Sequence, residues 1–163
     1  MEFSIIRTKK NHLNEILTLN ESFLPAVSSV DINQMNRFLR FADYFKSVLI
    51  NNKISGFLIA IQPGKKYDSL NYKWFEKKFE SFIYVDRIVI GSEFQDQGIG
   101  KAFYEDLQSY ASKKTNIITC EVNIKPSNEG SMIFHQKYGF KKVGTQITDN
   151  GKKEVCLMAY KMN

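Results

Sequence analysis

One stretch of the sequence, Val85–Ala102, constrains the fold of this chain more than any other. It begins inside Phe82–Ile90, a run of β-branched and aromatic residues that favours a buried strand. Gly98 and Gly100 follow, and glycine lets a backbone bend sharply or be approached closely. Apolar residues then recur at helical spacing, namely Ile99, Phe103, Leu107 and Tyr110. This predicted strand, turn and helix leaves unpaired N–H groups at the start of the helix, where phosphate groups bind well.

Two common phosphate-binding motifs do not fit this turn. The P-loop needs a serine or threonine after its Gly-Lys pair, but Ala102 follows Lys101. The dinucleotide fingerprint needs a third glycine, and Phe103 occupies that place. The motif that is present, Gln95-x-x-Gly98-x-Gly100 after a strand, resembles the acyl-CoA pyrophosphate loop of the GNAT superfamily of N-acetyltransferases. The alternative is a strand–turn–helix corner whose glycines serve geometry alone.

Length and composition predict one globular domain over residues 1–163. A chain of this length can bury a sizeable core, and 43% hydrophobic residues argue against disorder. We find no apolar run typical of a signal peptide or a membrane span. Cys120 and Cys156 stand apart in strand-like runs, as core thiols of a reducing compartment do. We therefore expect a cytoplasmic protein with no membrane partner, and the lack of a Cys/His cluster predicts no metal.

The formal net charge of +6 allows two interpretations. A basic surface can bind nucleic acid. However, lysine and arginine are spread along the whole chain, mostly next to acidic residues. We therefore expect a solvated surface that also attracts anionic CoA, and no nucleic-acid partner.

The order of elements predicts a mixed α/β fold. Seven strands are expected, at Phe3–Arg7, Phe45–Ile50, Ile54–Ile61, Phe82–Ile90, Asn116–Asn123, Phe140–Thr148 and Glu154–Tyr160. Helices are expected after the first strand, after an Asp31 N-cap, from Ile99, and over Ser131–Tyr138. The helix from Ile99 joins two strands as a crossover, which makes that pair parallel. Tight turns such as Asp149-Asn150-Gly151 make the other pairs mostly antiparallel.

The connection Gln62–Ser81 is long for a compact domain. It contains Tyr72 and the only tryptophan, Trp74, and the spacing of Phe75 and Phe79 indicates one or two helical turns. Our hypothesis is that this segment forms part of an acceptor pocket, with Tyr72 and Trp74 as substrate-binding residues. An aromatic patch packed on the sheet is the alternative.

A second motif extends the resemblance to the whole chain. It reads Asn128-x-x-Ser131-x-x-Phe134-His135-x-x-x-Gly139-Phe140 and lies on a predicted turn and helix. With the element order, it resembles a complete GNAT domain from about Phe3 to Lys161. The resemblance implies a single α/β domain, whose mostly antiparallel twisted sheet has a central parallel strand pair and is flanked by helices.

The resemblance also implies where acetyl-CoA, the co-substrate, would bind. Backbone groups of Ile88 and Ile90 would pair with the pantetheine arm, and a backbone N–H near Val89 would stabilise oxyanion character at the acetyl carbonyl. Asn128 would hydrogen-bond the pantetheine region, and His135 would lie near the thiol. The backbone amides that would hold the pyrophosphate are those of Gln95, Asp96, Gln97, Gly98, Ile99, Gly100 and Lys101.

Direct transfer to an amine requires a base, because only a neutral amine is a nucleophile. Asp86 is the base candidate, since a carboxylate in an apolar strand needs a reason to be there. Tyr84 shares its face of the strand and is a further candidate substrate-binding residue, and Glu121 is a weaker candidate for the base. A structural role for Asp86, paired with Arg87 or another basic group, is the alternative.

His135 is the candidate acid. Many members of the family resemble one another in having a tyrosine here, whose reference pKa is about 10 against about 6.5 for histidine. His135 could donate through its neutral N–H or a water, or it could only pack under the cofactor. Tyr138 is close in sequence but three residues further round the helix.

The sequence therefore predicts an N-acetyltransferase that moves an acetyl group from acetyl-CoA to a primary amine of a small molecule or peptide. An alternative function, of a different class, is an acyl-CoA sensor module without catalysis. A third possible function, nucleic-acid binding, rests on charge alone. Many relatives dimerise through their C-terminal strands, so the resemblance is compatible with a homodimer.

Overall fold

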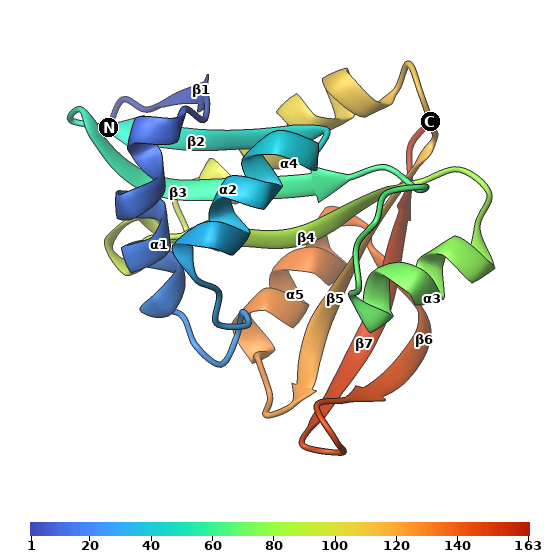
Figure 1. Ribbon diagram of the computed structural model, residues 1–163. Helices are drawn as coiled ribbons and strands as arrows, with labels where there is room; N and C mark the ends of the chain where they lie inside the picture. Colours follow the sequence, from blue (N-terminus) through green and yellow to red (C-terminus); the bar gives the residue numbers. More distant parts are fainter. The chain divides into compact units, whose positions relative to one another are not determined.

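The computed structural model describes residues 1–163 as one seven-stranded sheet with five α-helices (Figure 1). The strands are β1 Ser4–Arg7, β2 Tyr44–Ile50, β3 Lys53–Ile61, β4 Ile83–Ile90, β5 Ile117–Lys125, β6 Lys141–Thr148 and β7 Lys153–Lys161. The helices are α1 Leu13–Glu21, α2 Ile32–Phe41, α3 Leu70–Lys78, α4 Ile99–Ala111 and α5 Glu129–Tyr138. Short 3₁₀ turns cover Lys10–His12 and Ser92–Phe94. No helix is both long and apolar enough to cross a membrane.

The predicted mixed sheet is confirmed. Its strand order is β1-β2-β3-β4-β5-β7-β6. The pair β4–β5 is parallel, with Ile83 opposite Ile118 and Tyr84 opposite Thr119. The pairs β1–β2, β2–β3, β5–β7 and β6–β7 are antiparallel. The crossover through α4 produces this parallel pair, as the sequence predicted.

Backbone contacts group the chain into two compact units, which we describe separately. The first unit comprises Met1–Ile61 and Arg87–Gln108, and the second comprises Gln62–Asp86 and Ser109–Asn163. Strand β4 therefore contributes its first half to the second unit and its second half to the first.

The core of the first unit follows from the apolar periodicities of its helices. Ile99, Phe103 and Leu107 of α4 are all buried, as their spacing predicted. Asp31 caps α2, because its Oδ1 accepts a hydrogen bond from the backbone N–H of Gln34 at 2.8 Å. The buried residues of α1 and α2 include Leu13, Ile16, Met35 and Phe38.

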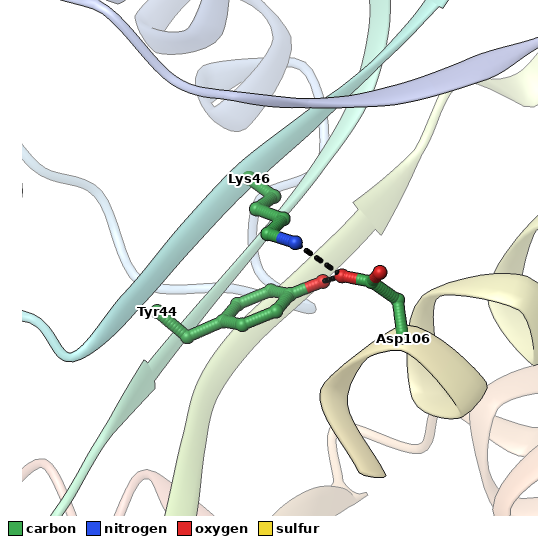
Figure 2. Close-up of polar contacts among 3 residues, drawn as sticks. All are labelled: Tyr44, Lys46 and Asp106. Carbon is green, nitrogen blue, oxygen red and sulfur yellow. Dashed lines mark hydrogen bonds and ion pairs between the residues drawn. The ribbon is translucent and has the colours of Figure 1, made fainter. Parts of the chain in front are cut away.

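A polar contact joins β2 to α4 within the first unit (Figure 2). The Tyr44 hydroxyl and the Lys46 ammonium group both donate to Oδ2 of Asp106, each at 2.7 Å. Burial, and then the Asp106 carboxylate, raise the pKa of Tyr44, so its hydroxyl stays protonated and donates. This contact fixes the middle of α4 against the sheet.

A buried arginine holds the connection between α1 and α2. Arg87 donates to Oδ1 of Asn20 at 3.0 Å and to the carbonyl of Ser28 at 3.0 Å. Its guanidinium group also lies over the ring of Phe38, 5.2 Å from the centroid. The polar residues of this connection therefore serve a buried cation, which needs such partners.

In the second unit, α3 is longer than the one or two turns expected from Phe75 and Phe79. It spans Leu70–Lys78, and the Ser69 hydroxyl caps it by accepting from the N–H of Tyr72 at 3.2 Å. Tyr72 and Phe75 are fully buried and contact Phe82 and Tyr84 of the sheet segment. The Ser69 cap and this aromatic packing stabilise α3. The spacing of Phe75 and Phe79 alone could not indicate either contribution.

Candidate functional site

The loop that follows β4 in the first unit is fixed by its two glutamines. Gln95 donates from Nε2 to the carbonyl of Ile90 at 3.0 Å. Gln97 donates from Nε2 to the carbonyl of Glu93 at 3.1 Å. The side chains thus bind the preceding turn, and the loop's own backbone groups remain for other partners.

The backbone of this loop adopts the left-handed conformation twice, at Asp96 (φ 60°) and Gly98 (φ 84°). A Cβ atom on Gly98 would meet nothing within 4 Å, so the positive φ, not crowding, is what requires glycine. The first helical bond of α4 runs from the N–H of Ala102 to the carbonyl of Gly98 at 3.0 Å. The N–H groups before Ala102 therefore form the open start of a helix that has no acidic residue in its first turn. This arrangement can bind an anion.

Strand β4 carries three residues predicted to contact the co-substrate. Val89 is buried, whereas Ile88 and Ile90 are half-buried. The carbonyl of Val89 lies close to Gly56, where a Cβ atom would stand 2.7 Å from it. β3 can approach β4 this closely only because residue 56 is glycine.

The two candidate carboxylates lie in a polar cluster of the second unit. Asp86 accepts a hydrogen bond through Oδ1 from the hydroxyl of Tyr67. The Tyr84 hydroxyl lies 2.6 and 2.8 Å from the two carboxylate oxygens of Glu121 and donates to them. Asn71 donates from Nδ2 to Oε1 of Glu121 at 3.2 Å. We call Tyr67, Asn71, Tyr84, Asp86 and Glu121 the carboxylate cluster.

The electrostatics of Tyr84 show how compact this cluster is. Burial is the main cause that raises the pKa of Tyr84 well above its ordinary value of 10. The charges of Glu121 and Asp86, together with Tyr67, raise it further. Tyr84 therefore stays protonated and acts as a donor to Glu121, which stabilises the ionised carboxylate.

Two of these five residues lie in the connection Gln62–Ser81, which the sequence predicts to form part of an acceptor pocket, but they are not among its predicted substrate-binding residues. Tyr67 and Asn71 come from the long connection between β3 and β4, and Gln146 of β6 donates to Oδ1 of Asn71 at 2.8 Å. The predicted substrate-binding residues of this connection are Tyr72 and Trp74. The polar run Tyr67–Asn71, just before them in the sequence, is the signal that points to Tyr67 and Asn71.

The structure places Tyr72 and Trp74 in packing contacts. The Tyr72 hydroxyl donates to the carbonyl of Gln62 at 2.6 Å and accepts from the N–H of Lys65 at 3.0 Å. Trp74 packs on β6, where a Cβ atom on Gly144 would come within 2.6 Å of the indole. These contacts hold both side chains within the connection and against β6, and the polar residues beside them reach the carboxylates. Substrate binding by Tyr72 and Trp74 stays a prediction.

His135 lies in a buried, largely aromatic setting on α5. Its Nδ1 donates to the carbonyl of Ser131 at 2.7 Å, and its ring stands edge-on to Phe134 and Phe140. Burial lowers the pKa of His135 from 6.5 to about 4. At neutral pH the ring therefore carries one proton, on Nδ1, and Nε2 is an acceptor.

Asn128 caps the same helix. Its Oδ1 accepts from the N–H of Ser131 at 3.3 Å. The predicted contact of Asn128 with pantetheine would therefore use its side-chain N–H groups, which donate to no group of this chain.

The comparison with protein families gives a direct result. Residues 13–140 match the model of the acetyltransferase (GNAT) family. The chain belongs to this family. The matched residues include the loop after β4, the carboxylate cluster, and Asn128 with His135, and they run through both compact units.

Solved structures share the fold of this chain at low sequence identity. Ard1 from Thermoplasma volcanium has a TM-score of 0.81 at 12% identity, with 100% of this chain and 99% of that chain covered. The ribosomal-protein-S18-alanine N-acetyltransferase from Escherichia coli has a TM-score of 0.72 at 15% identity, covering 99% and 95%. Naa50 from Arabidopsis thaliana, in complex with the bisubstrate analogue CoA-Ac-MVNAL, has a TM-score of 0.74 at 13% identity, covering 99% and 100%. No curated protein matches the sequence.

Proposed function

We propose that this chain is an N-acetyltransferase that transfers the acetyl group of acetyl-CoA directly to a primary amine. Its membership of the acetyltransferase family supports acyl transfer in general. The observation that carries the finer proposal is the carboxylate cluster, in which Asp86 and Glu121 are held by Tyr67, Tyr84 and Asn71. A module that only senses acyl-CoA would have no need of ionised groups held ready for an amine.

For the co-substrate, we assign the pyrophosphate to the backbone amides of Gln95–Lys101. The two left-handed residues and the open start of α4 support this assignment. The pantetheine arm would pair with the backbone of Ile88 and Ile90, and the N–H of Val89 would stabilise the oxyanion. Asn128 would donate to the pantetheine amide. Acetyl-CoA supplies the activated acyl group, and no metal is required.

The proposed reaction is a single displacement. Asp86, with Glu121 as the second candidate, accepts a proton from the protonated amine, directly or through a water. The neutral nitrogen attacks the acetyl carbonyl carbon, the C–S bond breaks, and CoA leaves as a thiolate. At neutral pH His135 carries a single ring proton, on Nδ1, and donates it to the carbonyl of Ser131, so this arrangement argues against the acid role suggested by the sequence. In this proposal the second proton, which the attacking nitrogen must lose as the amide forms, passes through a water to the thiolate and gives the free thiol of CoA.

The acceptor is an amine of a peptide or a small molecule. Two structural neighbours, the S18-alanine N-acetyltransferase and the Naa50 complex, support this choice. The name of the first and the bisubstrate analogue of the second point to protein and peptide amines. An anionic cluster suits the ammonium form in which such amines reach the site. We place the reaction in the cytoplasm, and a homodimer is compatible with it.

The first test combines acetyl-CoA-dependent thermal stabilisation with thiol release against a panel of amines and peptides. A ligand at about 100 times its dissociation constant stabilises the native state by about 2.7 kcal/mol. Gly98→Val should abolish most of this stabilisation. Valine strongly disfavours the φ of 84° at this position, so the loop must change conformation and its amides no longer point at the pyrophosphate. Gly64→Val is the matched control, since Gly64 has φ 90° and equally open surroundings in another loop.

Three outcomes are informative. Stabilisation with thiol release for one class of amine supports the enzyme. Stabilisation without release from any amine, in a panel that includes peptide N-termini, polyamines and amino acids, favours the sensor. Equal loss of stabilisation in the Gly98 and Gly64 variants would overturn the assignment of the pyrophosphate loop.

The base is tested by the pH dependence of kcat/KM. Asp86→Asn should lower kcat/KM by about 10²-fold or more and remove the acidic limb of the profile, because general-base catalysis contributes about this much. Glu121→Gln tests the second candidate in the same way. If both variants keep the wild-type profile, neither carboxylate is the base and the mechanism proposed here fails.

A further inference from the structure

The positive charge of this protein is concentrated in one of its two units. The second unit contains fourteen lysines and eight acidic residues, whereas the first contains nine basic and nine acidic residues. The whole net charge of +6 therefore belongs to the second unit. Since none of the arginines lies in that unit, its positive charge is carried by lysine alone.

Sheet topology gathers many of these lysines at one end of the second unit. Strand β5 runs parallel to β4, β7 runs antiparallel to β5, and β6 runs antiparallel to β7. The starts of β4, β5 and β6 and the end of β7 therefore share one end of the sheet. Exposed lysines lie at the end of α3 before β4, in the segment before β5, at the first residue of β6 and at the last residue of β7. We call these six the lysine row: Lys77, Lys78, Lys113, Lys114, Lys141 and Lys161.

Specific contacts hold the segments of the lysine row together. The hydroxyl of Ser81, before β4, donates to the carbonyl of Lys114 at 3.4 Å. The N–H of Met162 donates to the carbonyl of Asn116 at 2.7 Å, and Lys161 lies opposite Ile117. Lys141 lies opposite Ala159, two residues from Lys161. In Figure 1 the C-terminus accordingly lies beside the start of β5.

The lysine row carries charge that the chain itself does not neutralise. None of its six ammonium groups forms an ion pair, and Lys114 lies over the ring of Tyr110, 5.4 Å from its centroid. Acidic residues flank only the α3 pair, at Glu76 and Glu80. Across four adjacent strands the row extends for roughly 14 Å, at about 4.8 Å per strand. Like charges gathered in this way raise the local potential and attract a polyanion.

We propose that the lysine row binds the phosphate backbone of a nucleic acid. Lysine acts as a point charge suited to phosphate, whereas base reading most often uses the fork of arginine, which is absent from this unit. A membrane surface fits less well, because no large exposed apolar residue adjoins the row. The sequence predicts no nucleic-acid partner, because lysine and arginine are spread along the whole chain, mostly next to acidic residues. The sheet topology of the second unit brings the lysine row to one end of the sheet.

This site is distinct from the proposed acyl-transfer chemistry. Within the second unit, Asp86 and Glu121 lie further along β4 and β5 than the lysines that come before these strands. The lysine row can therefore be tested without knowing the acceptor amine.

The experiment measures fluorescence anisotropy of a short labelled single-stranded RNA, and of its DNA counterpart, over a range of salt concentrations. Contact with about three phosphates should give a slope of about −2 in log K against log salt. The row variant, with Lys113, Lys114, Lys141 and Lys161 changed to Gln, should lose about tenfold or more in affinity and have a shallower slope. The matched control changes Lys66, Lys125, Lys152 and Lys153 to Gln, which removes the same charge from the same unit and should lose much less.

A second measurement needs no variant. Bound RNA should protect the row lysines of the wild-type protein from acetylation by an amine-reactive reagent, read by mass spectrometry, and leave Lys66 and Lys152 reactive. The proposal would be overturned if the two quadruple variants lost RNA affinity equally, or if bound RNA protected all lysines to the same extent. Either result would mean that the net charge alone causes binding. The absence of binding at low salt would also overturn the proposal. Binding to phosphatidylserine vesicles without binding to RNA or DNA would assign the row to a membrane instead.

Discussion

At the scale of single residues, burial decides what the titratable groups can do. Tyr84 and His135 both lie almost fully buried, and burial favours the neutral form of each. For Tyr84 this keeps a phenol proton that it donates to Glu121. For His135 it leaves a single ring proton at neutral pH. The same physical cause thus keeps the phenol proton of Tyr84 and disfavours the imidazolium form of His135.

The low pKa of His135 predicts a loss of stability in mild acid. The folded protein holds this pKa at about 4, whereas the unfolded chain has 6.5. Between these values only the unfolded state binds the proton, so stability falls as the pH drops from about 6.5 towards 4. The full effect is on the order of 3 kcal/mol, at about 1.4 kcal/mol for each pH unit. Urea unfolding of the wild type and of His135→Gln, compared at several pH values, should show a shallower slope in the variant.

His12→Gln is the control for this measurement, because His12 is the only other histidine and lies in the short turn before α1. The slope between pH 6.5 and 4 should be shallower in His135→Gln than in His12→Gln. A slope in His135→Gln no shallower than in His12→Gln would show that other groups govern the acid sensitivity of the fold.

The residue types at the site could be predicted from sequence, but their partners could not. Asp86 stands out because a carboxylate interrupts an apolar strand. The donors to Asp86 and Glu121 come from separate parts of the chain: Tyr67 from the connection before α3, Asn71 from α3, and Tyr84 from β4, which pairs with β5. These contacts depend on tertiary packing, which the sequence pattern does not show. His135 was identifiable by motif, but its protonation depends on burial against Phe134 and Phe140, which no spacing reveals.

At the scale of elements, strong local signals predicted most of the sheet and its helices. Alternating and β-branched runs gave the seven strands within a residue or two, and Asp31 gave the start of α2. Helix α3 was expected only in part, because its aromatic residues do not form a single apolar stripe: Tyr72 and Phe75 are buried, whereas Trp74 packs on β6. Long-range packing, here between Trp74 and Gly144, supplies what local propensity lacks.

That contact yields a prediction about how α3 is held. In Gly144→Ala the new Cβ would lie 2.6 and 2.9 Å from two indole carbons of Trp74, at an irregular point of β6. We expect a loss of about 1–3 kcal/mol in the free energy of unfolding, typical of overpacking a rigid side chain. In the Trp74→Leu background the same substitution should cost much less, and a double-mutant cycle in urea measures this coupling.

Gly130→Ala is the matched control, because Gly130 lies in α5 with open space around it. It should be neutral or stabilise the protein by up to about 1 kcal/mol, as alanine is the better helix former. Equal costs of Gly144→Ala with and without the indole would mean that Trp74 does not hold α3 against β6.

At the scale of the whole molecule, β4 is the element that both compact units require. Its residues Ile83–Asp86 belong to the second unit and Arg87–Ile90 to the first. Each half has essential partners in its own unit: Tyr84 pairs with β5 and packs on α3, and Arg87 fixes the α1–α2 connection. A continuous strand cannot lose one half without freeing residues that the other half helps to fix. The division of contacts into two units should therefore not appear as two stages of unfolding.

We accordingly predict one cooperative transition, a property that small single domains usually show. Fluorescence of Trp74, the only tryptophan, reports on the second unit, whereas far-ultraviolet circular dichroism reports on both. The two urea transitions should coincide. Acetyl-CoA, which we assign to a loop of the first unit, should then shift the Trp74 transition as far as it shifts the dichroism, because a ligand stabilises every part of a cooperative unit equally. The contrary result is a dichroism curve with two steps, only one of which coincides with the Trp74 transition. If acetyl-CoA then shifted only the other step, β4 would not couple the two units.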